Sequence, residues 1–271
     1  MEKLTPTRLR KGSMMQYEIT DLAMNIAKLD VVQGDTLFVQ SALHSFGVPR
    51  HSTKINLNEQ IFKQLQIMVG DAGNIVVPTF NFEFCKGSAY DVKETPSQRM
   101  GIFSEYVRTL NYSIRSKHPI QSISVFGEKA KHICSHDTYS AFETNSPFDK
   151  LLKLDAKVLL LGAHAQAVSF VHVAEEQNNV PYRYWKEFNG QYYDGEGAVS
   201  HRSYGSFVRN LEINPILKLN KVERILIDRE LVQKTKFSFG NLSLFNARDF
   251  VAVVNDKLKH NPNWLIEDEI C

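Results

Sequence analysis

Short apolar runs alternate with amphipathic stretches through the first 160 residues of the chain. Residues 34–40 (GDTLFVQ), 74–80 (NIVVPTF) and 157–162 (KVLLLG) have the apolar composition of strands that are buried on both faces. Residues 19–29 (ITDLAMNIAKL) and 57–70 (LNEQIFKQLQIMVG) repeat apolar residues at the spacing of helices with one buried face. Such alternation is typical of a parallel or mixed sheet covered by helices, so we predict an α/β fold.

The middle of the chain continues this alternation after an irregular segment. Residues 81–99 show neither period and are long for a loop in a compact domain, which favours a functional loop. A helix is predicted at 96–110, with Thr95 and Ser97 as candidate caps. Further predictions are a strand at 122–127, short helices at 128–134 and 147–155, and a helix at 168–179 that places His172 and Glu176 on one face.

From Tyr182 onward, aromatic and polar residues alternate. Asn189-Gly190 and Asp194-Gly195 are both strong hairpin dipeptides, so residues 182–208 are predicted to form a β-hairpin insertion. Helices are predicted at 210–220 and 244–258, with a strand either near 223–228 (ERILID) or at 231–237 (LVQKTKF). No repeat or long linker is visible, so we expect a single domain over residues 1–271, with residues 1–15 as a basic arm on its surface.

Charge and cysteine content exclude several classes of protein. Thirty-two Lys and Arg residues against thirty Asp and Glu residues give a net charge of +2, which is too small to indicate a nucleic-acid-binding protein. The three cysteines form no CxxC pair, so a secreted disulfide framework is not expected. The N-terminus lacks the apolar core of a secretory signal, and no stretch is apolar enough to span a membrane. We therefore expect a cytoplasmic protein.

Common catalytic motifs are absent, and a metal site is not expected. The chain has no GxxxxGK[ST], no GxGxxG after a strand and no GxSxG, which disfavours P-loop NTPases, dinucleotide-dependent oxidoreductases and α/β-hydrolases. His132, Cys134 and His136 are close in sequence, but no second ligand pair stands at metal spacing. We interpret the two histidines as surface residues of a short helix, with Cys134 turned inward.

Two segments carry candidate site residues. Residues 115–127 (RSKHPIQSISVFG) place basic residues before a strand, where phosphate ligands bind in α/β sheets, although a solvated basic loop is an equal alternative. Residues 157–176 (KVLLLGAHAQAVSFVHVAEE) lead from a buried strand through a turn into a helix that carries His172. A histidine in that position is also common in a protein core.

Together with other segments, these two resemble the aminoglycoside 3-N-acetyltransferase (antibiotic N-acetyltransferase) family. The similarity extends over about residues 30–180 with the motifs in the family's order. It thins after Tyr182, although residues 243–254 (SLFNARDFVAVV) resemble the family's last helix. The matching segments are VQSALHSFG (39–47), PTFNF (78–82), MGIFSEYVR (100–108), RSKHPIQSISVFG (115–127), SPFDKL (146–151) and KVLLLGAHAQAVSFVHVAEE (157–176).

The resemblance implies an acyl-CoA-dependent N-acyltransferase with acetyl-CoA or another acyl-CoA as donor. His172 matches the histidine taken as general base, and Glu105 matches the carboxylate thought to assist it. These residue types suit the chemistry, because an ammonium group must lose a proton before its nitrogen attacks a thioester. A carboxylate hydrogen-bonded to the imidazole would fix its tautomer.

The resemblance also implies which residues meet the donor. Ser41, Ala42 and Leu43 match a turn expected to line the pantetheine and thioester, where backbone N–H groups polarise the carbonyl. The family's usual histidine and second serine are replaced by Gln40 and Ala42, so only backbone roles carry over at position 42. Four further positions are expected near the CoA arm and its phosphates: Arg115, Lys117, His118 and Ser122.

The expected acceptor is an amino sugar. Aminoglycosides are polycations that call for carboxylates, whereas the presumed acceptor loops at 81–99 and 136–150 mix both charges with aromatic residues. We therefore favour a nucleotide-linked sugar, such as a dTDP-linked 3-amino-3,6-dideoxyhexose, which Arg183 would hold by its pyrophosphate. The alternatives are an aminoglycoside 3-N-acetyltransferase that confers resistance and a CoA-binding module without turnover. The other candidate acceptor residues are Thr79, Asn81 and Tyr90.

Overall fold

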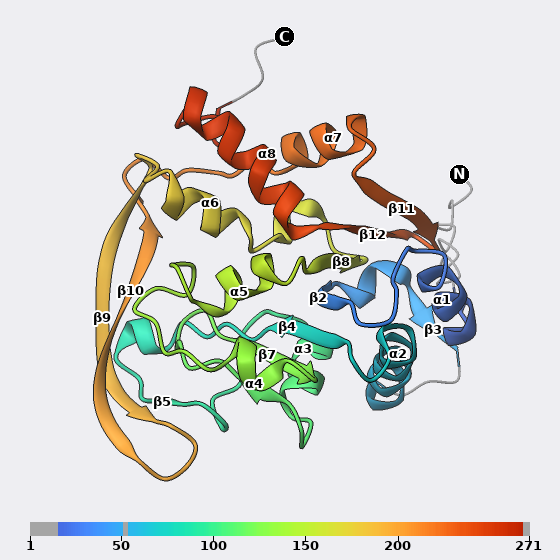
Figure 1. Ribbon diagram of the computed structural model, residues 1–271, viewed down its shortest axis with the longest axis horizontal. Coiled ribbons are helices and arrows are strands. Elements are labelled where there is room, and N and C mark those ends of the chain that lie inside the picture. Colours follow the sequence, from blue (N-terminus) through green and yellow to red (C-terminus); the bar gives the residue numbers. More distant parts are fainter. Residues whose placement is uncertain (1–15, 51–53, 268–271) are drawn as a thin grey trace, which may run out of the picture.

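A mixed sheet of seven strands forms the middle of the protein (Figure 1), in a computed structural model that describes residues 16–50 and 54–267. The expected arm at 1–15 lies outside the described residues. The central strands β8, β2 and β4 are parallel, and antiparallel strands extend the sheet on both sides, which confirms the predicted α/β fold. In spatial order the strands are β11 (Val232–Phe237), β12 (Gly240–Asn246), β8 (Lys157–Leu161), β2 (Thr36–Ser41), β4 (Asn74–Pro78), β7 (Ile123–Gly127) and β6 (Ile114–Arg115).

Helices cover both faces of the sheet, and each face has its own apolar core. Along β2, Leu37 and Val39 belong to one core and Phe38 to the other, because alternate side chains of a strand point to opposite faces. This double burial explains why the central strands are continuous apolar runs. The first core contains residues of α1 (Ile19–Ile26), α2 (Lys54–Val69) and α3 (Ile102–Arg108); the second contains residues of α4 (Ala130–Ile133), α5 (Pro147–Lys153), α6 (Val171–Gln177), α7 (Asn220–Asp228) and α8 (Ala247–His260).

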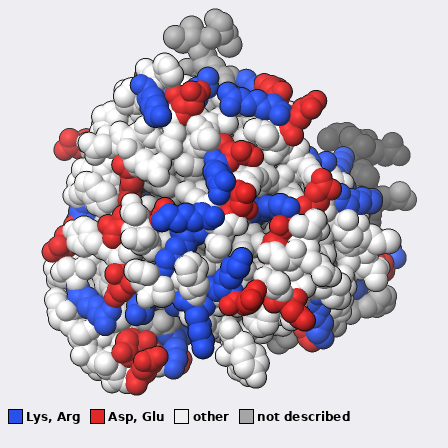
Figure 2. Space-filling model, viewed as in Figure 1, with Lys and Arg blue, Asp and Glu red and all other residues white. Residues whose placement is uncertain are grey.

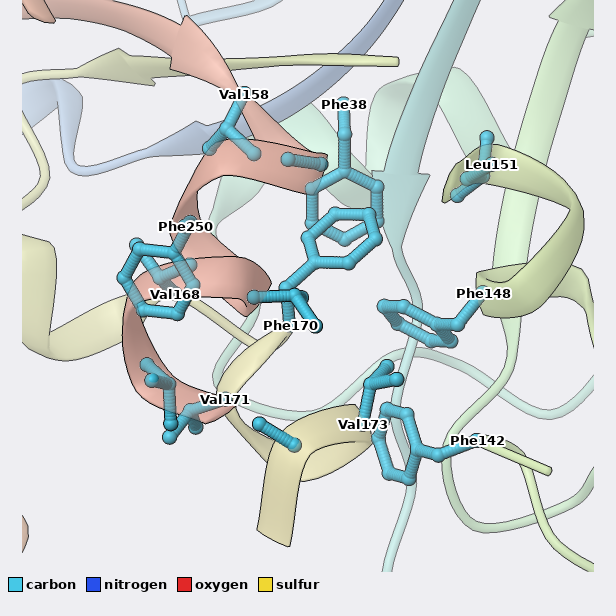
Figure 3. Close-up of a cluster of buried hydrophobic side chains, with 14 of the residues drawn as sticks. Phe38, Phe142, Phe148, Leu151, Val158, Val168, Phe170, Val171, Val173 and Phe250 are labelled. Atoms are coloured by element: carbon cyan, nitrogen blue, oxygen red, sulfur yellow. The ribbon is translucent and has the colours of Figure 1, made fainter. Parts of the chain in front are cut away.

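Aromatic rings fix the start of α6 against the sheet (Figure 3). The ring of Phe170, immediately before the helix, lies 5.1 Å from that of Phe38 and 5.3 Å from that of Phe148, measured between centroids. Both contacts are edge-to-face, the favourable geometry for aromatic pairs. The first turn of α6, which carries His172, therefore has a defined position at the end of the sheet.

A long hairpin packs beside the sheet, as predicted. Strands β9 (Arg183–Tyr193) and β10 (Val199–Arg209) pair over their whole length, and β5 (Tyr90–Asp91) adds a third, parallel strand. Only one predicted turn is used: the chain reverses after Asp194, whereas Gly190 lies inside β9 opposite Arg202. A Cβ at Gly190 would lie 2.9 Å from the ring of Phe84, so this glycine permits the close approach of β9 to Phe84.

Two short strands form a separate parallel pair, β1 (Gln16–Tyr17) and β3 (Val48–Pro49).

The helix predicted at 96–110 begins later than expected. Helix α3 starts at Ile102, after Gly101 with a φ of 88°, a conformation that favours glycine. The candidate caps are used elsewhere, since Thr95 Oγ1 accepts the N–H of Asp91 and Ser97 Oγ donates to Glu105. The prediction of Thr95 and Ser97 as caps is therefore wrong.

The helix predicted at 210–220 is also wrong. One turn forms, in which the Asn214 N–H donates to the carbonyl of Asn210 at 3.0 Å. It does not continue into a helix, because Asn214 has a φ of 46° and Pro215 offers no backbone N–H. Helix α7 begins only at Asn220 and includes residues 223–228. The strand left open between two positions is the one at 232–237, β11.

Charges are intermixed on the surface. In Figure 2, basic and acidic side chains alternate, with a denser band of basic ones across α8, α5 and α4. This distribution agrees with the small net charge of +2. Among the described helices, none is both long enough and apolar enough to cross a lipid bilayer.

Candidate active site

A cleft of about 910 Å³ opens at the carboxyl ends of β2, β4 and β8. This is the edge of a parallel sheet at which ligands usually bind. Helices α3 and α6 each contribute residues of their first turn to its walls. The lining consists of residues 40–45, Pro78, Phe80, residues 99–102, residues 162–164, residues 166–169, Val171, His172 and Leu217.

One wall of the cleft is the turn after β2. Ser41, Ala42 and Leu43 all line the cleft, where β2 passes into a 3-10 helix, η1 (Leu43–Phe46). The Ala42 N–H donates to the carbonyl of Leu161 at 2.9 Å, which ties this turn to the end of β8. A Cβ at Gly162 would lie 2.1 Å from Ser45 Oγ, so only glycine permits this approach.

His172 lies in the cleft with one ring nitrogen already bound. Its Nδ1 is 2.6 Å from Oε2 of Glu175, one turn along α6. An ionised carboxylate accepts hydrogen bonds and donates none, so Nδ1 carries the proton in this pair and Nε2 is the nitrogen with a free lone pair. The imidazole is 26% exposed and packs against the ring of Phe142. It therefore offers Nε2 as a base while its orientation is held from behind.

Glu175 is fully buried and paired on both carboxylate oxygens. Its Oε1 lies 2.8 Å from Nε of Arg183, in an ion pair that lacks the alignment of a hydrogen bond. Burial alone would raise the pKa of Glu175, but the hydrogen bond with His172 and the charge of Arg183 outweigh it and lower the pKa. Glu175 is thus an anion at neutral pH.

Glu105, the carboxylate expected to assist His172, has other partners in this structure. Glu105 accepts hydrogen bonds from the N–H and hydroxyl of Ser97, at 3.0 and 2.7 Å, and pairs with Arg108 at 2.6 Å. Although burial acts to raise the pKa of Glu105, these hydrogen bonds lower it to about 2. Glu105 does not reach His172 and instead fixes the segment that leads to Gly101 at the rim of the cleft.

Glu176, predicted to share a helix face with His172, has a different partner. Glu176 accepts from the hydroxyl of Ser140 at 2.7 Å, and burial raises its pKa to about 7. The i, i+3 spacing of His172 and Glu175 was the available signal for the true pair, because positions three apart also share a helix face.

Arg115 and Ser122, expected at the CoA arm, lie in a buried polar cluster outside the cleft. Arg115 donates to the Thr79 carbonyl at 2.7 Å and to Ser122 Oγ at 3.0 Å, and its guanidinium lies 5.2 Å from the Tyr90 ring centre. Its remaining donors reach carbonyls of the 81–99 loop. Arg115 thus bonds to Ser122 and Thr79 and packs on the ring of Tyr90, and none of these four residues lines the cleft.

His118 anchors the hairpin. Its Nδ1 accepts the backbone N–H groups of Ile120 and Gln121, at 3.3 and 3.2 Å, so Nε2 carries the proton and donates to the carbonyl of Gly205 in β10. Burial lowers the pKa of His118 to about 4, so the ring is neutral. His118 does not line the cleft, and its expected role at the CoA arm stays a prediction.

Three other expected site residues also lie outside the cleft lining. Asn81 donates to the carbonyl of Pro96, inside the 81–99 loop. Lys117 is exposed, and its carbonyl accepts from the hydroxyl of Tyr192 in β9. Arg183 is 8% exposed, pairs with Glu175 and does not line the cleft.

Several cleft residues were missed in the sequence. Gln40 donates to the carbonyl of Ala167 and to Ser169 Oγ, which connects β2 to the segment before α6. Arg99 lines the opposite side. Among the described residues that line the cleft, none is Asp or Glu, and the ionisable ones are Arg99, His44, His164 and His172.

A metal centre is not visible in the part of the chain that the structure describes, since no three His, Cys, Asp or Glu residues are grouped to hold an ion. Cys134 is buried and donates to the carbonyl of Ile114. His136 is exposed, with its Nδ1 2.7 Å from Nζ of Lys150. The inward Cys134 and the exposed His132 of α4 agree with the interpretation, whereas His136 lies beyond the helix, which ends at Ile133.

Comparisons with known proteins agree with the fold. Aminoglycoside N(3)-acetyltransferase III from Salmonella sp is 24% identical over 203 residues, which cover 68% of this chain and 69% of the relative. Aminoglycoside N(3)-acetyltransferase VII from Streptomyces paromomycinus is 25% identical over 181 residues, covering 60% of this chain and 61% of the relative.

Solved structures of similar fold cover almost the whole chain. Aminoglycoside acetyltransferase AAC(3)-Xa superposes with a TM-score of 0.79 at 17% identity, covering 92% of this chain and 95% of that protein. AAC-IIIb, solved as a binary complex with CoASH, gives 0.76 at 20% identity, covering 91% and 97%. The Bacillus subtilis protein YokD gives 0.75 at 21%, covering 93% and 96%.

A family-wide comparison settles the class. The sequence model of the family described as aminoglycoside 3-N-acetyltransferase matches residues 38–259, which include every strand of the central sheet except the first residues of β2. The expected antibiotic N-acetyltransferase-like fold and an acyl-CoA-dependent N-acyltransferase are thereby confirmed. The chain belongs to the aminoglycoside 3-N-acetyltransferase family.

Proposed function

We propose that the protein transfers an acyl group from acyl-CoA to an amino group of an amino sugar, with His172 as general base. The observation that carries this is the pair in the cleft, in which Glu175 holds Nδ1 of His172 at 2.6 Å and leaves Nε2 free. A buried carboxylate behind the imidazole favours the imidazolium that forms when Nε2 takes a proton. We also propose that the protein is cytoplasmic, and its dependence on acyl-CoA supports this location.

The reaction needs no covalent acyl-enzyme. The amine nitrogen attacks the thioester carbonyl while its proton passes to Nε2 of His172, a C–N bond forms, and the C–S bond then breaks to release the CoA thiolate. Of the predicted turn, Ala42 has its N–H bound to Leu161. The N–H of Leu43, in the first turn of η1, is the member of this turn best suited to polarise the carbonyl.

The acceptor that we favour carries a negative or neutral group rather than several positive ones. A polycation would be bound by carboxylates, and the described lining of the cleft contains none, while Arg99 adds a positive charge. A nucleotide-linked amino sugar, such as a dTDP-linked 3-amino-3,6-dideoxyhexose, matches that lining. The donor acyl group is acetyl or a longer hydroxyacyl chain.

An aminoglycoside is the second candidate acceptor. The observation that favours it is the family itself, since the curated relatives are named aminoglycoside N(3)-acetyltransferases and one similar structure, AAC-VIa, was solved bound to sisomicin. A CoA-binding module without turnover is disfavoured, because such a module has no use for a buried carboxylate held against a cleft histidine.

Release of the CoA thiol distinguishes these candidates. Purified protein is mixed with acetyl-CoA or 3-hydroxybutyryl-CoA and either a dTDP-linked amino sugar or kanamycin, and thiol is followed with a chromogenic reagent. We expect release with the nucleotide sugar and its loss in His172→Ala. Release with kanamycin alone would select the aminoglycoside, and no release with either amine would favour the binding module.

A further inference from the structure

A buried arginine stands behind the catalytic pair. Arg183 is the first residue of β9, and its Nε lies 2.8 Å from Oε1 of Glu175, on the side of the carboxylate away from His172. The Arg183 side chain is 8% exposed and that of Glu175 is 0% exposed. Three groups therefore form a line from hairpin to cleft: guanidinium, carboxylate, imidazole.

Strand β10 and the turn before β9 hold Arg183 in place. Its own backbone N–H donates to the carbonyl of Val180, and its Nη1 donates to the carbonyl of Phe207 in β10 at 3.0 Å. A guanidinium fixed in this way cannot swing into the cleft without losing the partly buried hydrogen bond to Phe207 and the contact with Glu175. Its charge is thus directed permanently at Glu175.

We propose that Arg183 is a positioning residue that keeps Glu175 ionised and oriented, and so sets how readily His172 takes up a proton. This inference rests on the proposed role of His172 as base. It gives the hairpin a part in the reaction, because the hairpin brings the positive charge to the rear of the catalytic pair.

The charges around the pair define the direction of the effect. A buried carboxylate without a cation would hold a proton strongly, whether on its own oxygen or shared with the imidazole. The positive charge of Arg183 opposes that added proton, so it favours the state of the pair in which Glu175 is ionised and Nε2 of His172 is free. Other ionisable groups among the described residues also face the pair: Glu176, Tyr182 and Glu143, which lies next to Glu176. Helix α8 contacts α6 through Asn255, which is uncharged.

The test compares Arg183→Met with Arg183→Lys across the pH profile of kcat/KM. In Arg183→Met the acidic limb moves to higher pH by about one unit or more, the size of shift that a charge in contact produces. The deficit is therefore about tenfold or more near pH 6 and shrinks as pH rises. Arg183→Lys keeps the charge and stays close to the wild-type limb. Arg202→Met, another arginine of the hairpin, is the control and leaves the limb in place.

Two outcomes overturn the proposal: an equal loss of kcat/KM at every pH in Arg183→Met, or the same shift in Arg183→Lys as in Arg183→Met. If Arg183→Met does not fold, Arg183→Gln takes its place with the same expectation. An NMR titration of the labelled His172 ring, assigned with His172→Gln, needs no substrate and moves in the same direction. Absence of acyl transfer by the wild type would therefore reject the proposed function, while the ring titration would still decide the role of Arg183.

Discussion

The cleft and the polar cluster under the hairpin look alike in the sequence and differ in the structure. Both contain histidine, serine and arginine beside a strand end, and both match motifs of one family. In the cleft, His172 has one ring nitrogen bound and the other free. In the cluster, both nitrogens of His118 and the donors of Arg115 are bound to protein atoms.

The difference teaches that residue type and sheet-edge position do not by themselves identify a ligand site. A buried polar group whose hydrogen bonds are all made within the protein holds segments together. Arg115 and His118 hold the 81–99 loop and β10 to the sheet edge. Their motif therefore specifies the position of the hairpin, and the hairpin carries Arg183 to the rear of the cleft.

The largest expected effect is a loss of stability in Arg115→Met. Methionine fills similar space but takes the Arg115 donor from the Val92 and Thr95 carbonyls, while the Thr79 carbonyl keeps only the Ser122 hydroxyl, so the free energy of unfolding should fall by roughly 3 to 5 kcal/mol. Urea denaturation measures this loss. The KM for acetyl-CoA should change little in the folded variant. A large rise in that KM with unchanged stability would instead place Arg115 at the donor, as the family resemblance implies.

The next effect is a pH dependence of stability caused by His118. Its pKa is about 4 when folded and about 6.5 when unfolded, so the unfolded chain binds the proton first as pH falls. The stabilisation is complete above about pH 6.5 and is lost towards pH 4, by about 3 kcal/mol in total. Urea denaturation at a series of pH values measures it.

His118→Gln keeps a hydrogen-bonding side chain but removes this titration. Between pH 7 and 4 it should lose less stability than the wild type does, whereas the control His201→Gln, an exposed histidine of β10, should follow the wild type. Identical pH slopes for wild type and His118→Gln would show that the ring is not held neutral by burial.

The third effect belongs to the cleft. His172→Ala should lower kcat by about 100-fold or more, the usual loss for a general base, with little change in the free energy of unfolding. His164→Ala is the matched control, because His164 lines the same cleft and no carboxylate is bonded to its ring in the described structure. Steady-state kinetics with thiol detection measure both. Equal losses of kcat in the two variants would contradict the role of His172 as general base.

The central strands and the cleft residues beside them could be predicted from the sequence, because the signals that identify them lie in short, continuous segments. The central strands are readable because both their faces are buried, and residues 41–43 and His172 follow from motif positions next to those strands. Helix 210–220 failed at Asn214 and Pro215, where local backbone chemistry outweighs apolar spacing.

The carboxylate partner of His172 could not be chosen from sequence alone. Glu175 and Glu176 both follow His172 at helical spacing. The choice depends on contacts from distant segments, since Arg183 pairs with Glu175 and Ser140 bonds Glu176. Spacing along one helix predicts which groups share a face, and tertiary contacts decide which of them stays charged.

The smallest effect should come from Glu105→Gln, at the border between the two regions. Glu105 is 36% exposed and holds Ser97, just before the rim residues Arg99 and Gly101. Loosening that segment should raise KM about a few-fold, because the free energy lost is roughly that of one partly exposed, charged hydrogen bond. The acidic limb of the kcat/KM profile should stay at the same pH. Glu175→Gln removes the negative charge beside the imidazole and should move the same limb to lower pH. If instead Glu105→Gln moved this acidic limb as far as Glu175→Gln does, Glu105 would be the carboxylate that assists His172. Glu105 would then belong to the cleft.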